Sequence, residues 1–214
     1  MARAAAIAAV SITLMGMSQS AAHEKGLYVR LRAMTIAVIH GDLAGARADA
    51  DWIARRPGIS TQIAQPAAAV QSASDVGGAA AAAASLAAAC GSCHQAAGAA
   101  LVIPESQPAA PGRIVAHMQA HQDAAGLLLA GLVAPDGDAW VRGARQLASA
   151  PLRSGEFPTS DRIGALMAEI ETRLHAQAAT AVPADPRARV EHYGAITATC
   201  GQCHARHTSL WERD

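Results

Sequence analysis

The hydrophobic and polar positions of the chain recur at helical spacing along most of its length. Sustained alternation of Val, Ile, Thr or Tyr, which is typical of a half-buried strand, does not occur in the sequence, and its abundant alanine, leucine and arginine favour helix. Clusters of proline, glycine and aspartate mark the ends of the periodic segments. The pattern predicts helices over residues 24–40, 42–56, 71–98, 112–134, 137–149, 161–178 and 186–206. The expected fold class is therefore all-α.

A proline-rich stretch divides this pattern into two similar halves. Residues 104–111, PESQPAAP, contain three prolines and no helix signal, and we expect them to form a linker. When Gly41-Asp42 is set against Pro135-Asp136, an offset of 94, the apolar positions on either side coincide. The sequence thus predicts a tandem duplication. Its expected parts are a first helical half over residues 23–103, with 59–70 unassigned, and a second, four-helix half over residues 112–214.

The first 22 residues have the composition of a secretory signal peptide. Arg3 gives a positive start, Ala4 to Met17 form an apolar stretch, and Ser20-Ala21-Ala22 is a small-residue cleavage pattern. The apolar stretch is shorter than the roughly 20 residues that a membrane span needs. Apolar stretches elsewhere are interrupted by Arg, Asp or Gly. We therefore expect cleavage of residues 1–22, a mature periplasmic protein that begins near His23, and no membrane span after the signal is removed.

The composition of the chain disfavours some classes of partner and indicates what could fill the core. The 17 basic residues balance the 17 acidic ones without a long run of either sign, which argues against nucleic acid or an anionic membrane as the main partner. The chain has only three Trp, two Tyr and one Phe, although aromatic rings normally supply much of a core's buried area. A bound planar cofactor would fill the space that these rings leave.

All four cysteines lie in two copies of one motif, CGSCH at residues 90–94 and CGQCH at residues 200–204. Thiols at positions i and i+3 of a helix lie on one face, one turn apart, which suits addition to the two vinyl groups of one haem. A histidine at i+4 lies on the same face and is carried over the iron. The motifs predict two covalently attached haem c groups, the first bound by Cys90, Cys93 and His94 and the second by Cys200, Cys203 and His204.

Other uses of these cysteines fit the sequence less well. A thioredoxin-type redox pair needs a preceding strand in a βαβ setting, and neither copy has one. A zinc site built from both pairs would span more than a hundred residues and would leave the two histidines unexplained. A disulfide between cysteines three apart on a helix is geometrically awkward. Haem c is attached outside the cytoplasm in bacteria, which agrees with the signal peptide.

The position of the second motif indicates which kind of cytochrome the chain is similar to. Only ten residues follow His204, too few for a class I cytochrome c domain, whose motif lies near its start. With its motif on the last of four predicted helices, the second half resembles the class II cytochromes, the bundles of the cytochrome c′ and c556 kind. The resemblance implies tandem helical bundles, each with a haem on its last helix. Many four-helix cytochromes dimerise, so a homodimer stays open.

The same resemblance implies that the residue opposite each motif histidine comes from the first helix of its bundle. In the second half that region holds three candidate iron ligands, preferred in the order His121, Met118 and His117. The offset of 94 carries these positions onto Leu27, Glu24 and His23 in the first half. The first iron is therefore expected either to bind His23, with Met34 and His40 as fallbacks, or to stay open under Leu27. We expect His175 to be solvated and His192 and His207 to lie at most near the second haem.

These features predict an exported di-haem electron carrier rather than an enzyme. Its irons would cycle between Fe(II) and Fe(III) while exchanging electrons with redox partner proteins. Two alternatives stay open. One is a cytochrome c′-like protein that binds NO or CO at an open first haem. The other is a di-haem peroxidase, although the sequence singles out no Glu or Gln as a distal acid or base.

Overall fold

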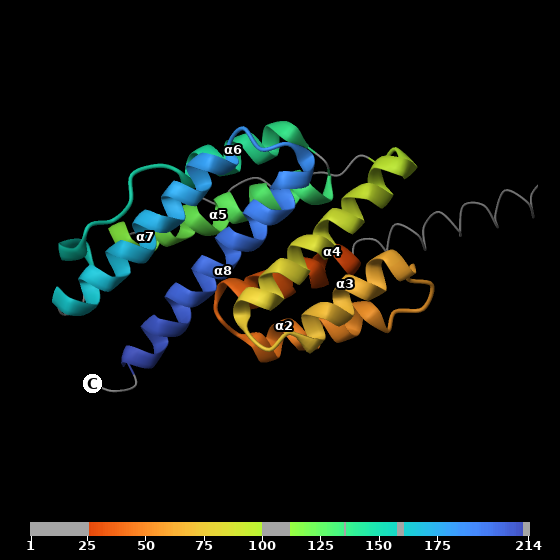
Figure 1. The fold of residues 1–214 in the computed structure, drawn as a ribbon, viewed down its shortest axis with the longest axis horizontal. Coiled ribbons are helices and arrows are strands. Elements are labelled where there is room, and N and C mark those ends of the chain that lie inside the picture. Colours follow the sequence, from red (N-terminus) through yellow and green to blue (C-terminus); the bar gives the residue numbers. More distant parts are fainter. Residues whose placement is uncertain (1–25, 100–111, 135, 158–160, 212–214) are drawn as a thin grey trace, which may run out of the picture.

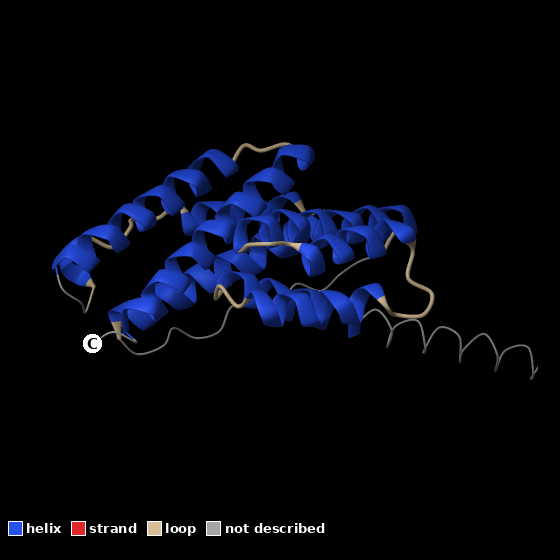
Figure 2. Cartoon of the chain, turned by 60° about the horizontal axis from the view of Figure 1, so that its bottom comes forward, coloured by secondary structure: helices blue, strands red, loops and turns tan. Residues whose placement is uncertain are grey.

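The computed structural model describes residues 26–99, 112–134, 136–157 and 161–211, and these form helices joined by loops and turns, without a strand (Figures 1 and 2). The all-α prediction is confirmed. In chain order the helices are residues 26–39, α2 (Leu43–Ala54), α3 (Thr61–Ser72), α4 (Val76–Ala97), α5 (Arg113–Val133), α6 (Gly137–Leu147), the short 3₁₀ helix η1 (Ser154–Glu156), α7 (Asp161–Ala181) and α8 (Pro186–Trp211). The predicted signal peptide (1–22), His23 and the predicted linker (104–111) lie outside the described residues.

One helix, α3, lies where the sequence pattern gave no assignment. Its interior contains Pro66, which cannot donate a backbone hydrogen bond and normally argues against a helix. The helix nevertheless buries Ile63, Ala67 and Val70, spaced so that they share one face. Burial of this face outweighs the missing bond. The predicted helix over 71–98 consequently starts later, at Val76, because its first two residues end α3.

Aspartate side chains fix the starts of several helices. An aspartate N-cap accepts one or two backbone N–H bonds of 2.8–3.0 Å at the start of α2, α4, α6 and α8, the caps being Asp42, Asp75, Asp136 and Asp185. Such caps satisfy N–H groups that have no partner within the helix. In the sequence Asp75 and Asp185 each stand 15 residues before the first cysteine of a motif. The two motif helices therefore begin at equivalent points.

The two motif helices, α4 and α8, pack against each other with opposite directions at the centre of the molecule (Figure 1). Small residues let them approach closely, because a Cβ at Gly194 would lie 3.2 Å from the Cα of Ala81. One end of the pair is equally tight: a Cβ at Gly201 would overlap Val76 and would lie 2.5 Å from the Val38 carbonyl oxygen. Since Gly201 lies beside Val76, the first motif, which begins 14 residues after Val76, is about 20 Å further along the pair. The motifs thus occupy opposite ends.

The other helices flank this central pair. Helix α3 packs on α2 and α4, whereas α5 packs on α6, and α7 lies between α6 and α8 (Figure 1). Contacts also join the two halves of the sequence, since α5 packs on α4. One apolar core runs through both halves and includes Met34, Leu86, Leu128 and Tyr193. Its largest side chain, Trp140, is fully buried and donates its indole N–H to the Ala181 carbonyl at 2.8 Å.

Among the described residues, α4 is the one helix long and apolar enough to cross a membrane by length and composition. The same criteria fit a core helix of a water-soluble protein. Within the structure α4 packs on α3, α5 and α8, and it buries Leu86 together with a series of alanines. This packing buries 39% of the most apolar stretch of α4.

The close contact between α5 and α6 gives a test of the packing. A Cβ at Gly143 of α6 would lie 2.8 Å from the Ala124 carbonyl oxygen and 3.0 Å from the Leu128 nitrogen, both in the α5 backbone. We expect Gly143→Ala to lower the free energy of unfolding by about 1–3 kcal/mol, because the helices must move apart. Gly126→Ala is the matched control, since its Cβ would meet nothing within 4 Å, and it should stabilise the protein by up to about 1 kcal/mol. Urea unfolding followed by circular dichroism measures both, and equal effects would contradict the packing.

Candidate functional site

The first motif occupies the last turns of α4, and its histidine is held by another helix. Cys90 is half-buried against the main core, whereas Cys93 is exposed. The His94 Nδ1 atom lies 2.9 Å from the carbonyl oxygen of Val133, the last residue of α5. A carbonyl only accepts hydrogen bonds, so Nδ1 is the donor, and in the neutral ring Nε2 keeps a lone pair. Histidines that bind metals are usually oriented by such a bond from the second ring nitrogen.

The second motif lies in the C-terminal part of α8, and its two cysteines contact two different apolar clusters. Cys200 is buried at the edge of the main core. Cys203 is half-buried and packs against a small separate apolar cluster that also contacts Met118 of α5. The His204 ring lies 5.3 Å, centroid to centroid, from the ring of His40, which follows the first helix. His40 thus lies beside the second motif rather than the first.

All four cysteines are free thiols, and three of them sit in protected surroundings. Burial raises the pKa of both Cys90 and Cys200 to about 12, and the paired motif cysteine adds to the shift in each case. Burial likewise raises the pKa of Cys203 to about 11, with a further contribution from the Glu171 carboxylate. The two pairs are too far apart along α4 and α8 to share one zinc ion. The spacing of the motifs along the helices therefore excludes the four-thiolate site.

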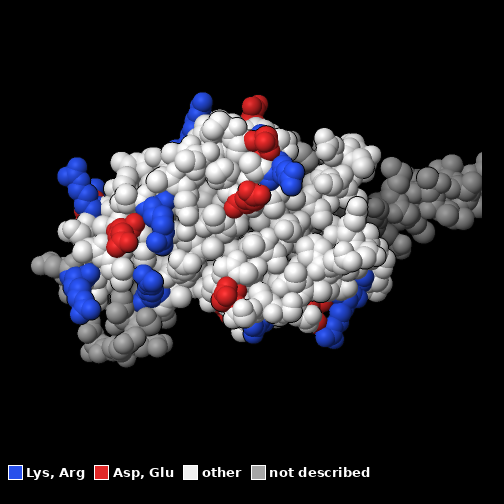
Figure 3. All heavy atoms as spheres, viewed as in Figure 1, with Lys and Arg blue, Asp and Glu red and all other residues white. Residues whose placement is uncertain are grey.

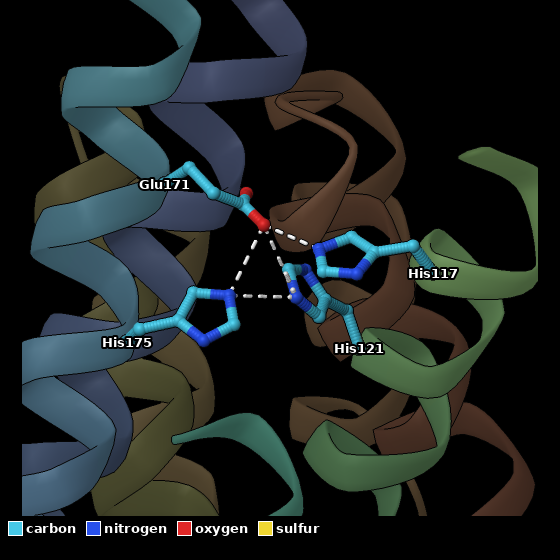
Figure 4. Close-up of side chains that lie close together, drawn as sticks. All are labelled: His117, His121, Glu171 and His175. Atoms are coloured by element: carbon cyan, nitrogen blue, oxygen red, sulfur yellow. Dashed lines mark hydrogen bonds and ion pairs between the residues drawn. The ribbon is translucent and has the colours of Figure 1, made fainter. Parts of the chain in front are cut away.

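A cluster of three histidines and one glutamate lies between α5 and α7. Its members are His117 and His121 from α5 and Glu171 and His175 from α7, and Figure 4 shows all four side chains pointing toward one another. Their ligand atoms lie within 4.8 Å of one another. We call these four residues the His₃Glu cluster. Each helix contributes an i, i+4 pair, a spacing that places both side chains on one face.

Glu171 is the centre of this cluster. Its Oε1 atom contacts the Nε2 atoms of His117, His121 and His175, the last two at 3.6 Å and 3.1 Å. Burial would raise the pKa of Glu171, but hydrogen bonds from His175 and His117 and the neighbouring imidazoles outweigh it and lower the pKa to about 2. Burial lowers the pKa of His121 to about 4, and the Glu171 carboxylate offsets this only in part. At neutral pH the cluster thus combines a buried carboxylate with a neutral His121.

The structure changes two expectations about these residues. His175, which we expected to be solvated, is only 4% exposed, because α7 turns residues 171 and 175 toward α5. The sequence analysis also singled out no acidic residue, whereas Glu171 is 3% exposed within the cluster. The sequence did contain a signal for both. Glu171 and His175 repeat the i, i+4 spacing of His117 and His121.

Other candidate residues lie away from the His₃Glu cluster. Met34 is fully buried in the main core, and Leu27 is half-buried against it. His192 is half-buried on α8, while the side chain of His207 lies outside the described residues.

An open pocket of about 630 Å³ borders His117. Its charged lining residues are Arg113, Arg153 and Glu156, and Arg113 forms an ion pair with Glu156.

Comparison of the chain with protein-family models, with curated protein sequences and with solved structures found no match. On the face drawn in Figure 3, acidic and basic side chains are interspersed. This face therefore does not favour a partner of one charge. The features of the chain that bear on its function are therefore the two motifs and the His₃Glu cluster.

The differing burial of the thiols predicts their reactivity in chain made without haem attachment. At pH 8 iodoacetamide should modify the exposed Cys93 first, because thiolate access controls alkylation. Cys90, Cys200 and Cys203 should react at least about tenfold more slowly, since burial raises the pKa of each. Peptide mass spectrometry over time measures the rates, and urea-unfolded chain is the control in which all four should react alike. Fast modification of Cys200 in the folded chain would contradict the buried position.

Proposed function

We propose that the chain is a di-haem c-type cytochrome that carries electrons between redox partner proteins. The observation that carries this proposal is the bond from His94 Nδ1 to the Val133 carbonyl, which leaves Nε2 of a Cys-x-x-Cys-His histidine free to bind iron. The free state of all four thiols supports it, because thioether attachment needs both cysteines of each pair. When bound, each haem supplies one-electron Fe(II)/Fe(III) chemistry.

The residues around the second motif have the polarity that a haem pocket needs, with apolar side chains for the porphyrin and arginines for its carboxylates. Cys203 and Met118 contact one small apolar cluster, formed by Leu152, Phe157 and Met167. Apolar side chains of this kind would cover the porphyrin and keep water from the iron. Arg113 and Arg153 line the neighbouring pocket and would offer cations to the haem carboxylates.

The relation between the halves supports the proposed tandem bundles. Asp75 and Asp185 cap the two motif helices at the same distance from the first motif cysteine. Each motif helix also meets the end of the first helix of the other half. His94 binds the Val133 carbonyl at the end of α5, and a Cβ at Gly41 would lie 3.1 Å from the Gly201 carbonyl oxygen. Two haems so placed would lie at opposite ends of the α4–α8 pair, in line for electron entry at one end and exit at the other.

For the sixth ligand of the second haem, the contacts favour Met118 over His121. Met118 already contacts the apolar cluster that Cys203 contacts. His121 and His117 are held instead by Glu171 and His175, and these interactions would have to break before either histidine reached an iron. Met118 therefore replaces His121 as the preferred ligand. If His23 binds the first iron, that haem should not bind CO. If the iron is open, it should bind CO.

Haem attachment is tested on full chain expressed in a host that attaches haem c. We expect its mass to exceed that of the polypeptide by two haem groups, and the pyridine haemochrome spectrum to give two haems per chain. Cys90→Ala with Cys93→Ala, and separately Cys200→Ala with Cys203→Ala, should each remove one haem, because each pair provides both thioether links. The bare polypeptide mass in the wild type would overturn the proposal.

Visible spectra test the sixth ligand of the second haem. We expect Met118→Ala to convert one haem from low-spin to high-spin and to create a site where ferrous iron binds CO, because a coordination position is vacated. His121→Ala should leave that haem low-spin, and His192→Ala serves as a control for loss of a half-buried histidine. Conversion by His121→Ala instead of Met118→Ala would restore His121 as the ligand.

A further inference from the structure

We propose that His117, His121, Glu171 and His175 bind one divalent transition-metal ion, Zn²⁺ or an ion of similar chemistry, between α5 and α7. This inference goes beyond the proposed haem function and does not rest on it, because no motif residue is among the four ligands. It rests on the positions of the ligand atoms, on the orientation of His175 and on the burial of the carboxylate.

Three of the ligand atoms are spaced nearly as in a tetrahedral metal site. The Nε2 atoms of His121 and His175 lie 3.1 Å apart, and each also approaches Oε1 of Glu171, at 3.6 Å and 3.1 Å. Ligands bound tetrahedrally at about 2.0–2.1 Å lie about 3.3 Å from one another. His117 Nε2 contacts the same Glu171 oxygen and supplies the fourth ligand. All four ligand atoms lie within 4.8 Å of one another, so a shift of the more distant side chains would enclose an ion.

The contacts of His175 turn its ring toward the other proposed ligands. Its Nδ1 donates to the backbone carbonyl oxygen of Ser149, which leaves Nε2 on the side of Glu171 and His121. That nitrogen lies 3.1 Å from Glu171 Oε1 and 3.1 Å from Nε2 of His121. A metal ion bound there would take the place of the proton shared by these atoms, because histidine binds metals through an unprotonated nitrogen. The bond from Nδ1 to a backbone carbonyl is also the usual way of orienting a metal-binding histidine.

Charge and ligand type identify the class of ion. Three imidazoles and one carboxylate suit Zn²⁺ and other first-row divalent ions, whereas Ca²⁺ and Mg²⁺ prefer oxygen ligands. The carboxylate of Glu171 is buried, and a buried charge needs a partner of opposite sign. Four protein ligands would complete a tetrahedral shell, as in structural zinc sites, where no position is left for substrate. The ion would thus clamp α5 to α7.

The test uses the full chain with both haems attached, treated with a chelator and then dialysed against Zn²⁺. We expect elemental analysis to give one tightly bound zinc per chain in addition to the haem iron, and Zn²⁺ to raise the melting temperature. Glu171→Gln and His175→Ala should each weaken Zn²⁺ binding by at least about tenfold. Glu169→Gln is the matched control, because Glu169 is an exposed glutamate on the same helix and should leave binding unchanged.

Several outcomes would overturn the inference. They are a wild-type protein that binds no zinc, binding by Glu171→Gln as tight as in the wild type, and binding only when Cys200→Ala and Cys203→Ala have removed the second haem. The last result would assign the histidines to haem iron. Circular dichroism of each variant separates lost ligands from lost folding, and wild-type stoichiometry decides the question even if one variant unfolds. Haem content is measured by mass, so failure of haem attachment is distinguished from failure of zinc binding.

Discussion

The close backbone contact between α4 and α8 determines where both motifs lie. Alanine and glycine on the facing surfaces bring the helices together, as at Ala81 and Gly194. Larger side chains at these points would separate the helices and break the continuous core that joins the halves. The poverty of aromatic residues follows from this arrangement as much as from any cofactor, because tightly packed small residues leave little room for rings. An expected sign of a planar cofactor thus has a second physical cause in the fold.

The His₃Glu cluster is a polar exception within this apolar packing. Side chains, rather than close backbones, bridge α5 and α7 there, and Glu171 is nearly inaccessible to water. A carboxylate in such a place is costly unless it is neutralised by nearby donors or a cation. Three imidazoles around one oxygen offset part of that cost, and the same contacts hold His117 and His121 against Glu171. The same contacts therefore bear on both proposals, that for the metal ion and that for Met118.

Sequence periodicity was sufficient for the fold class and for most helices, because alanine-rich amphipathic segments and aspartate caps are local signals. It failed at α3, where Pro66 hides a helix that only tertiary burial stabilises. The motif residues could be identified from spacing alone, since their chemistry depends on one helix. Glu171 and His175 could not, because their role depends on α7 facing α5, which no local pattern specifies. Their i, i+4 spacing was present but is common on exposed helix faces.

Helix α5 contacts both the His₃Glu cluster and the first motif, so a movement of this helix would affect both. Its early turns hold His117 and His121, whereas the carbonyl of Val133, about 20 Å away along the helix, accepts a hydrogen bond from His94 Nδ1. A rigid rod that slides or tilts at one end must do so at the other. Any event that draws the first turns of α5 toward α7 would therefore alter the bond that sets the electron-donating strength of the distant imidazole, so the two ends of the molecule share a mechanical link.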